Sequence, residues 1–164
     1  MRRNAMYSVR TDTLDRLLRI GMAVERQLVA ICRDLAITRS QAEILAYLLE
    51  HAPTVSEQAG RSVGEVAKAL QLRSPTVSHT ISGMSSPAPN PLVCATTSSK
   101  DARKRLITLT PEGHAVALKY QKAVAAVTDK LCKGIRADLH HAIETFENRV
   151  PGVRRRRKRL APAP

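Results

Sequence analysis

The apolar positions of the chain begin with a long helical seam. They recur at steps of three and four residues, the spacing that keeps one narrow stripe on a helix face. The seam consists of Leu14, Leu17, Gly21, Val24, Leu28, Ile31 and Leu35. This pattern predicts a helix over residues 11–36, behind a flexible arm at residues 1–10. So long a seam needs a large apolar partner surface, and a second chain is expected to supply it.

Capping boxes mark the starts of the next two predicted helices. Thr38 and Gln41 form the first box, and Ser62 and Glu65 form the second. The helix after the first box is expected to face inward through Ile44, Leu45, Leu48 and Leu49. The shorter helix after the second box is expected to do so through Val66, Ala67 and Leu70.

Another helix follows the tight turn QLRS. Ser74 has the form of an N-cap, with Pro75 at the first helical position, where a missing amide costs nothing. Val77, Ile81 and Met84 recur at helical spacing and are expected to face inward. The outward face then holds Pro75, Thr76, Ser78, His79 and Ser82. Two short helices joined by a tight turn, the second with small polar groups outward, predict a helix-turn-helix.

A basic hairpin is predicted after the helix-turn-helix. The Pro-rich stretch SSPAPNP ends the preceding helix. The segments LVCAT and KRLITLT have the composition of strands, and the polar tip TSSKDA joins them. On the second strand Ile107 and Leu109 share one face, which is expected to anchor the hairpin to the core.

A second helical seam follows the hairpin. Thr110 has the form of an N-cap, with Pro111 as the first helical residue. Steps of three and four then recur at Ala117, Tyr120, Val124, Val127 and Leu131. A last short helix is predicted to carry Leu139, Ala142, Ile143 and Phe146. The tail at residues 151–164 concentrates cations from Arg154 to Arg159 and is expected to be disordered.

The charge balance then indicates the class of partner. A net charge of +13 on a chain with 43% hydrophobic residues favours a polyanionic partner, nucleic acid before membrane. Aromatic residues make up only 2% of the chain, too few for the stacking platforms that hold single strands. Duplex DNA, which is held through phosphates and groove contacts, fits better. No apolar run is long enough to span a bilayer, so no membrane partner is expected.

The cysteines favour a reducing, cytoplasmic setting. Cys32, Cys94 and Cys132 are well separated and form neither a CxxC pair nor an even disulfide set. Each is best interpreted as a small core hydrophobe, and redox sensing by Cys32 or Cys132 is the alternative.

The chain shows no pattern typical of an enzyme. His140, His141 and Glu144 have a spacing that would allow a metal pair, but no third or fourth ligand accompanies them. A surface cluster is therefore favoured there. Because no nucleophile–base pair or phosphate loop is evident, we expect no catalysis, no metal and no cofactor.

The order of these elements resembles the MarR family of winged helix-turn-helix transcription regulators. The matching residues are SVGEVAKALQLRSPTVSHTI, then LV, then DARKRLITLTPEG, within a likeness that covers residues 11–150. The most specific part is the Asp-x-Arg of the hairpin, Asp101 and Arg103, followed by LITLTPEG.

The resemblance implies a mainly α fold with a small β-hairpin wing. Residues 11–36 and 111–150 would form dimerisation helices, and residues 37–110 the winged DNA-binding lobe. The homodimer would bind a pseudo-palindromic operator, with the recognition helix at residues 75–84 in the major groove and the wing at residues 92–109 in the minor groove. Such a protein would act in the cytoplasm, at the nucleoid, most often as a repressor. The resemblance also allows a small-molecule effector of unknown identity.

Three groups of residues carry these expectations. The major-groove contacts would come from Arg73, Ser74, Thr76, Ser78 and His79. The wing contacts would come from Lys100, Asp101, Arg103, Lys104 and Arg105. The dimerisation residues would be Leu14, Leu17, Val24, Leu28, Tyr120, Val124, Val127 and Leu131. The alternative is a chromatin-like protein that binds DNA without sequence preference through the charge of its wing and tail.

Overall fold

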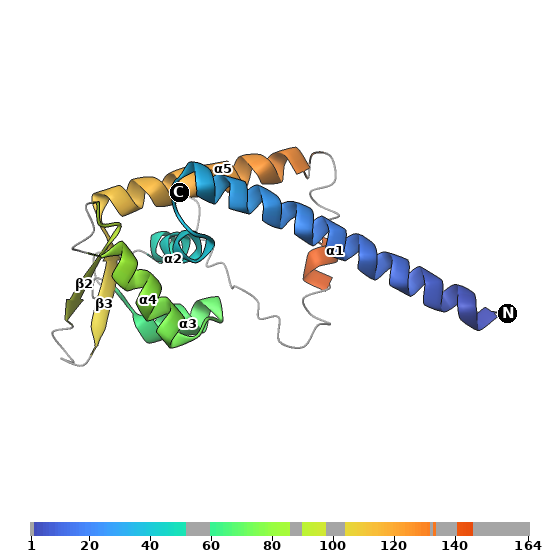
Figure 1. The fold of residues 1–164 in the computed structure, drawn as a ribbon, viewed down its shortest axis with the longest axis horizontal. Helices are drawn as coiled ribbons and strands as arrows, with labels where there is room; N and C mark the ends of the chain where they lie inside the picture. The colour runs from blue at the N-terminus through green and yellow to red at the C-terminus, as the bar shows by residue number, and fades with distance from the viewer. Residues whose placement is uncertain are drawn as a thin grey trace. The chain divides into compact units, whose positions relative to one another are not determined.

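The computed structural model describes residues 2–51, 60–85, 90–97, 104–131, 133 and 141–145, with the backbone alone for residues 2–13. The elements in order are α1 (Arg2–Asp34), α2 (Arg39–Glu50), β1 (Arg61–Ser62), α3 (Val63–Leu70), α4 (Ser74–Met84), β2 (Val93–Thr97), β3 (Arg105–Leu109) and α5 (Pro111–Leu131) (Figure 1). A helical segment at residues 141–145 follows. The chain divides into two compact units, Met1–Ala125 and Ala126–Pro164, and the winged lobe belongs to the first. The mainly α fold with a small sheet confirms the predicted fold class.

Helix α1 begins earlier than its apolar seam. The segment expected as a flexible arm is helical from Arg2 onward. Extending an existing helix adds one hydrogen bond for each residue fixed, and Arg, Ala and Met are good helix formers. The segment therefore continues the helix although it carries no apolar repeat.

Both predicted capping boxes are present. The Thr38 hydroxyl accepts a hydrogen bond from the Gln41 amide at 3.2 Å, and the Gln41 side chain accepts from the Thr38 amide at 2.7 Å. At the start of α3, the Ser62 hydroxyl accepts from the Glu65 amide at 3.3 Å. The Glu65 carboxylate in turn accepts from the Ser62 amide at 2.7 Å and from its hydroxyl at 2.8 Å. These boxes satisfy amides that the first turn of a helix leaves without partners.

The start of α4 differs from the prediction by one residue. The N-cap is Arg73 rather than Ser74, and its side chain makes no capping hydrogen bond. The Arg73 carbonyl accepts from the Val77 amide at 3.1 Å, so the helical ladder already begins there. Ser74 and Pro75 are then the first two helical residues, where no amide needs a helical partner.

The sheet has one strand more than predicted. Strands β2 and β3 form the expected antiparallel hairpin, with Val93 opposite Leu109 and Thr97 opposite Arg105. The two-residue strand β1 pairs with the other edge of β3, which gives the order β1-β3-β2. So short a strand has no alternation to reveal it, and only its pairing defines it.

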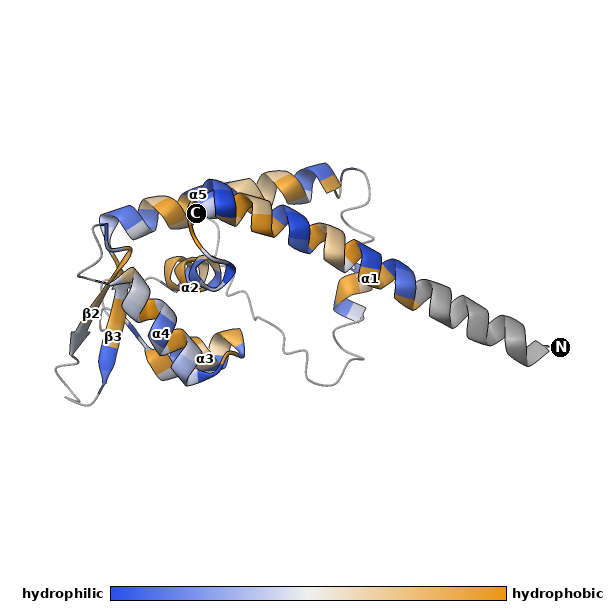
Figure 2. Cartoon of the chain, viewed as in Figure 1, coloured by the Kyte–Doolittle hydropathy of each residue, from blue (hydrophilic) through white to orange (hydrophobic). Residues whose placement is uncertain are grey.

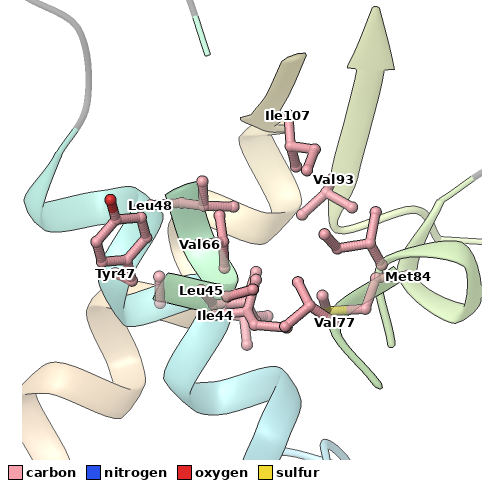
Figure 3. Packing of buried hydrophobic residues seen from close by; sticks show 13 residues of the cluster. Ile44, Leu45, Tyr47, Leu48, Val66, Val77, Met84, Val93 and Ile107 are labelled. Carbon is pink, nitrogen blue, oxygen red and sulfur yellow. The ribbon is translucent and has the colours of Figure 1, made fainter. Parts of the chain in front are cut away.

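The main core lies in the lobe and joins α2, α3, α4, the hairpin and the start of α5 (Figure 3). Its largest fully buried side chains are Ile44, Leu45, Val66, Val77, Met84, Val93 and Ile107. The predicted inward residues of α2, α3 and α4 all belong to this core, with Leu49 and Leu70 partly buried at its margin. Ile107 is buried and Leu109 packs against the core, which confirms the predicted anchor of the hairpin.

A second, smaller cluster joins α1, α2 and α5. Cys32, Ala42 and Tyr120 are buried in it, and Ile31, Leu35, Ile37, Ala46 and Val124 pack against them. Ile37 packs against both clusters and so lies between them. Within the described residues, α1 adds no side chain to the main core.

The base of the hairpin is tied to the helices on both sides. The Leu92 amide donates to the Met84 carbonyl at 2.8 Å, and the Leu92 carbonyl accepts from the Thr110 amide at 3.1 Å. The Thr110 hydroxyl donates to the Pro91 carbonyl at 2.7 Å and accepts from the Gly113 amide at 3.0 Å, which confirms it as the cap of α5. This network holds the wing strands in a fixed relation to α4 and α5.

Candidate nucleic-acid interface

Helix α4 presents a polar face to solvent. Val77, Ile81 and Met84 are buried in the main core, and this fixes the rotation of the helix. The exposed positions are Ser74, Pro75, Thr76, Ser78, His79, Ser82 and Gly83. The predicted outward residues are therefore all exposed, and they offer short hydroxyl donors and one imidazole. Thr80 is half-buried, and its hydroxyl donates to the Thr76 carbonyl at 2.9 Å.

The first turn of α4 favours an anion. Arg73 is exposed at its N-cap, and Ser74 is exposed as its first residue. The unpaired amides of a helix N-terminus carry a partial positive charge, to which the Arg73 guanidinium adds a full one. A DNA phosphate is the kind of group that such a helix start accommodates.

The described part of the wing adds two cations. Lys104 and Arg105 are both exposed at the start of β3, where Arg105 pairs with Thr97 of β2. Figure 1 shows the hairpin in the same lobe as α3 and α4. Lys100, Asp101 and Arg103 lie outside the described residues, so their predicted place at the tip stays a prediction.

Strand β1 brings in a cation that the sequence pattern did not single out. Hydrogen bonds from Ser62 lower the pKa of the Glu65 carboxyl, first through the amide and then through the hydroxyl. The positive charges of Arg61 and Lys104 lower that pKa further, so both lie near the start of α3. In the sequence, only the position of Arg61 directly before a capping box indicated that this cation lies near the start of α3. Its approach to β3 follows from strand pairing, with Arg61 opposite Ile107.

The predicted dimerisation residues differ in how far their side chains are exposed to solvent. Leu14 is 57% exposed, and Leu17, Val24 and Leu131 are also exposed. Leu28, Val124 and Val127 are half-buried. The apolar surface of α1 is wider than the predicted seam, because Leu18, Ile20, Met22 and Val29 are exposed as well. Figure 2 shows the hydrophobic positions recurring along the part of α1 whose side chains are described, from residue 14 onward.

Tyr120 departs from this group. It is only 7% exposed and belongs to the small cluster of its own chain. Its hydroxyl accepts a hydrogen bond from Nη1 of Arg39 at 2.5 Å. Burial raises the pKa of the Tyr120 phenol, and the nearby Arg39 charge partly opposes that shift. Its side chain packs within its own chain, and its predicted part in dimerisation stays a prediction.

The cysteines and histidines show no built chemical site in the described residues. Cys32 is buried, and burial raises the pKa of its thiol, with Arg39 opposing the shift and Glu25 and Glu43 adding to it. Cys94 is exposed on β2, so its interpretation as a small core hydrophobe is wrong, whereas that of Cys32 is confirmed. In the part of the chain that is described, no three His, Cys, Asp or Glu side chains gather closely enough to hold a metal ion. Cys132 and His140 lie outside it.

The described helices differ in length or composition from a membrane-spanning helix. None of them combines the length and the apolar composition that a bilayer-spanning helix requires.

Comparison with known proteins shows the fold. No protein-family model and no curated protein matches the chain. A MarR-family transcriptional regulator from Rhodococcus sp. RHA1 is similar at a TM-score of 0.66 and 19% identity, over 84% of this chain and 92% of that one. The S. aureus MepR–DNA complex is similar at 0.55 and 22%, over 82% and 98%. CouR from Rhodococcus jostii RHA1 with bound p-coumaroyl-CoA is similar at 0.63 and 19%, over 80% and 86%.

These matches and the core geometry define a winged helix-turn-helix protein. More narrowly, the chain has the fold of the MarR-family transcriptional regulators, which agrees with the resemblance in its sequence. At these identities the likeness establishes the fold.

Proposed function

We propose that the chain is a sequence-specific, double-stranded DNA-binding regulator of transcription that acts as a homodimeric repressor. The observation that carries this proposal is the exposed polar face of α4, whose opposite face is locked in the core. A helix held in that way can enter a major groove without rearranging. Its hydroxyls and imidazole then reach base edges or phosphates.

The contacts divide between the groove and the backbone. Thr76, Ser78 and His79 would face base edges from α4, while Arg73 and Ser74 would meet a phosphate at its first turn. Lys104 and Arg105 would meet phosphates from the wing. At the wing tip, Asp101 would hold Arg103 extended toward the minor groove, because an arginine suits a narrow and electronegative groove.

The homodimer would form through the apolar face of α1 and the later helices. The exposed Leu14, Leu17 and Leu18 support this assignment, since a large apolar surface on a helix marks an interaction site. Residues 11–36 and 111–150 would then be the dimerisation part and residues 37–110 the DNA-binding lobe. Two lobes related by a two-fold axis would read a pseudo-palindromic operator.

The structural neighbours support two further parts of the proposal. MepR from S. aureus was solved with DNA, and CouR with p-coumaroyl-CoA. A duplex operator and a small-molecule effector are therefore partners that this fold accommodates. We place the protein in the cytoplasm, at the nucleoid, where such an operator lies.

Competition binding tests the proposal. A duplex selected from a random pool by the purified protein should resist displacement by random duplex at about 150 mM salt. The selected sequence should be a pseudo-palindrome with half-sites about one helical turn apart. If random duplex competes as strongly as the selected duplex does, the chain is instead a non-specific, chromatin-like DNA-binding protein driven by its charge of +13.

His79→Ala supplies the matched comparison. This variant should relax the preference at one position of each half-site, because a groove contact to a base carries sequence information. Lys122→Ala, which removes an exposed cation of α5, should leave the sequence preference unchanged.

A further inference from the structure

One arginine connects three helices at the edge of the lobe. Arg39 is the first residue of α2, and each nitrogen of its guanidinium has a different partner. Nε lies 3.6 Å from the Glu25 carboxylate of α1, and Nη2 lies 3.2 Å from the Glu43 carboxylate of α2. Nη1 donates to the Tyr120 hydroxyl of α5 at 2.5 Å. The exposed fraction of the side chain is 33% for Arg39, 34% for Glu43 and 55% for Glu25, so the contact with Glu43 is shielded from water to a greater extent than the contact with Glu25.

Apolar packing at this junction is less extensive than in the main core. Among the described residues, the small cluster buries Cys32, Ala42 and Tyr120, of which the first two are small side chains. Five partly buried hydrophobics pack against them: Ile31, Leu35, Ile37, Ala46 and Val124. The main core holds the lobe together but takes nothing from the described part of α1. Small, few side chains tolerate sliding and rotation more readily than an interlocked core does. Polar contacts therefore matter more for the orientation of the lobe on α1 than they do for the fold of the lobe itself.

The connection between α1 and α2 is short and already shaped. Ala36 has a left-handed backbone (φ 53), and the Ile37 amide donates to the Cys32 carbonyl at 3.0 Å. These features set the path of the chain at one point. Further points of contact away from the connection are needed to set the crossing angle. The packing of Cys32 on Ala42 in the small cluster and the contact between Arg39 and Glu25 supply them. The planar guanidinium is suited to this because its donors have a rigid fork geometry.

We infer that Arg39 is a positioning residue that sets the angle of the DNA-binding lobe on α1, and through it the operator spacing that the dimer accepts. This role rests on the proposed function, since it concerns the distance between two DNA-reading helices. A change of angle at the junction would move α4 together with α2, because both helices pack in the main core. Loss of the contacts should therefore change the distance between the two recognition helices of the dimer. It should leave the binding of a single lobe to a single half-site intact.

Operator spacing is the readout that separates this role from a merely structural one. The affinities of the full-length protein would be measured for three duplexes: the operator it selects, a single half-site, and the operator with one base pair inserted between the half-sites. One inserted base pair rotates and shifts one half-site relative to the other. The wild type should bind the selected operator best and lose affinity on insertion.

Arg39→Gln should lose on the order of tenfold in affinity for the selected operator. Its affinity for the single half-site should equal that of the wild type, and its penalty for the inserted base pair should shrink. Arg39→Lys should resemble Arg39→Gln, because a point charge cannot hold three partners in one plane. Tyr120→Phe, which removes only the hydroxyl, should show part of the same loss.

Arg33→Gln is the matched control, since it removes an exposed cation from the last turn of α1 by the same substitution. It should keep the spacing preference of the wild type. Equal losses by Arg39→Gln on the operator and on the half-site, or an unchanged spacing preference, would overturn the inference. A wild type that selects no operator would instead overturn the proposed function, so the two failures are distinguishable.

Discussion

At the scale of single residues, Gly113 shows how closely the wing base is packed. A Cβ built on Gly113 would lie 1.8 Å from the Leu92 carbonyl oxygen, far inside any real contact. That same carbonyl accepts from the Thr110 amide at 3.1 Å, so it cannot move without breaking that hydrogen bond. A residue without a side chain is needed where these two backbones meet.

Gly113→Ala should therefore destabilise the fold by about 3 kcal/mol. Chemical denaturation followed by circular dichroism would measure the loss. Gly64→Ala is the control, because a Cβ at Gly64 meets nothing within 4 Å. That variant should stay within about 1 kcal/mol of the wild type. Equal stabilities for the two variants would contradict the close approach.

At the scale of elements, capping chemistry decides where the helices of the lobe begin. The boxes at Thr38 and Ser62 and the cap at Thr110 each satisfy amides of a first turn. Only α4 starts without a side-chain cap, among the helices whose N-caps the structure describes. An uncapped start leaves amides available for an outside acceptor, which agrees with the phosphate contact proposed there.

The start of α3 should make stability depend on acid. The pKa of Glu65 is lower in the folded chain than its ordinary value of 4.5, so its carboxylate stabilises the fold above that value. The stabilisation should disappear as the pH falls below 4.5 and passes through the lower folded pKa. Denaturation at about pH 6 and about pH 3 would compare the wild type with Glu65→Gln.

Glutamine keeps the hydrogen bond of the box but does not titrate. Glu65→Gln should therefore lose less stability on acidification than the wild type does. Glu65→Ala, which lacks the acceptor, should be the least stable of the three near pH 6, because it leaves the Ser62 amide without its partner. The same acid sensitivity in the wild type and in Glu65→Gln would show that this carboxylate plays no part.

At the scale of the whole molecule, the exposed apolar surface of α1 has no counterpart among the described residues of the lobe. Leu14 and Leu18 are each 57% exposed, whereas Ile44, Leu45 and Leu48 of α2 are buried. A surface of this kind is unfavourable in water unless a partner covers it. A second copy of the chain is the partner proposed above.

Leu17→Lys should disrupt the proposed dimer and leave the single chain folded, because Leu17 belongs to neither buried cluster. The dimer dissociation constant, measured by sedimentation, should rise by at least about tenfold. Ala23→Lys puts the same charge on an exposed position of α1 away from the seam and should change the constant little. A Leu17→Lys chain that sediments as the wild type does would remove α1 from the interface.

Much of the lobe was predictable from short-range patterns. The apolar repeats placed Ile44, Val77 and Ile107 in the core, and the capping boxes placed the starts of α2 and α3. These signals act within one or two helical turns, so they can be read from neighbouring letters. The same repeat predicted the exposed face of α4, because the positions outside the repeat must face away from the core.

The sequence by itself thus determined which segments are helices and strands, which face of each is apolar, and that the chain is basic. Only the tertiary structure decided that Arg61 joins the sheet, that Tyr120 turns into its own chain and that Gly113 meets Leu92. It also brought Arg39 to Tyr120, 81 residues further along the chain. Such meetings depend on how whole elements pack, and no local repeat records the distance between two elements once they are folded.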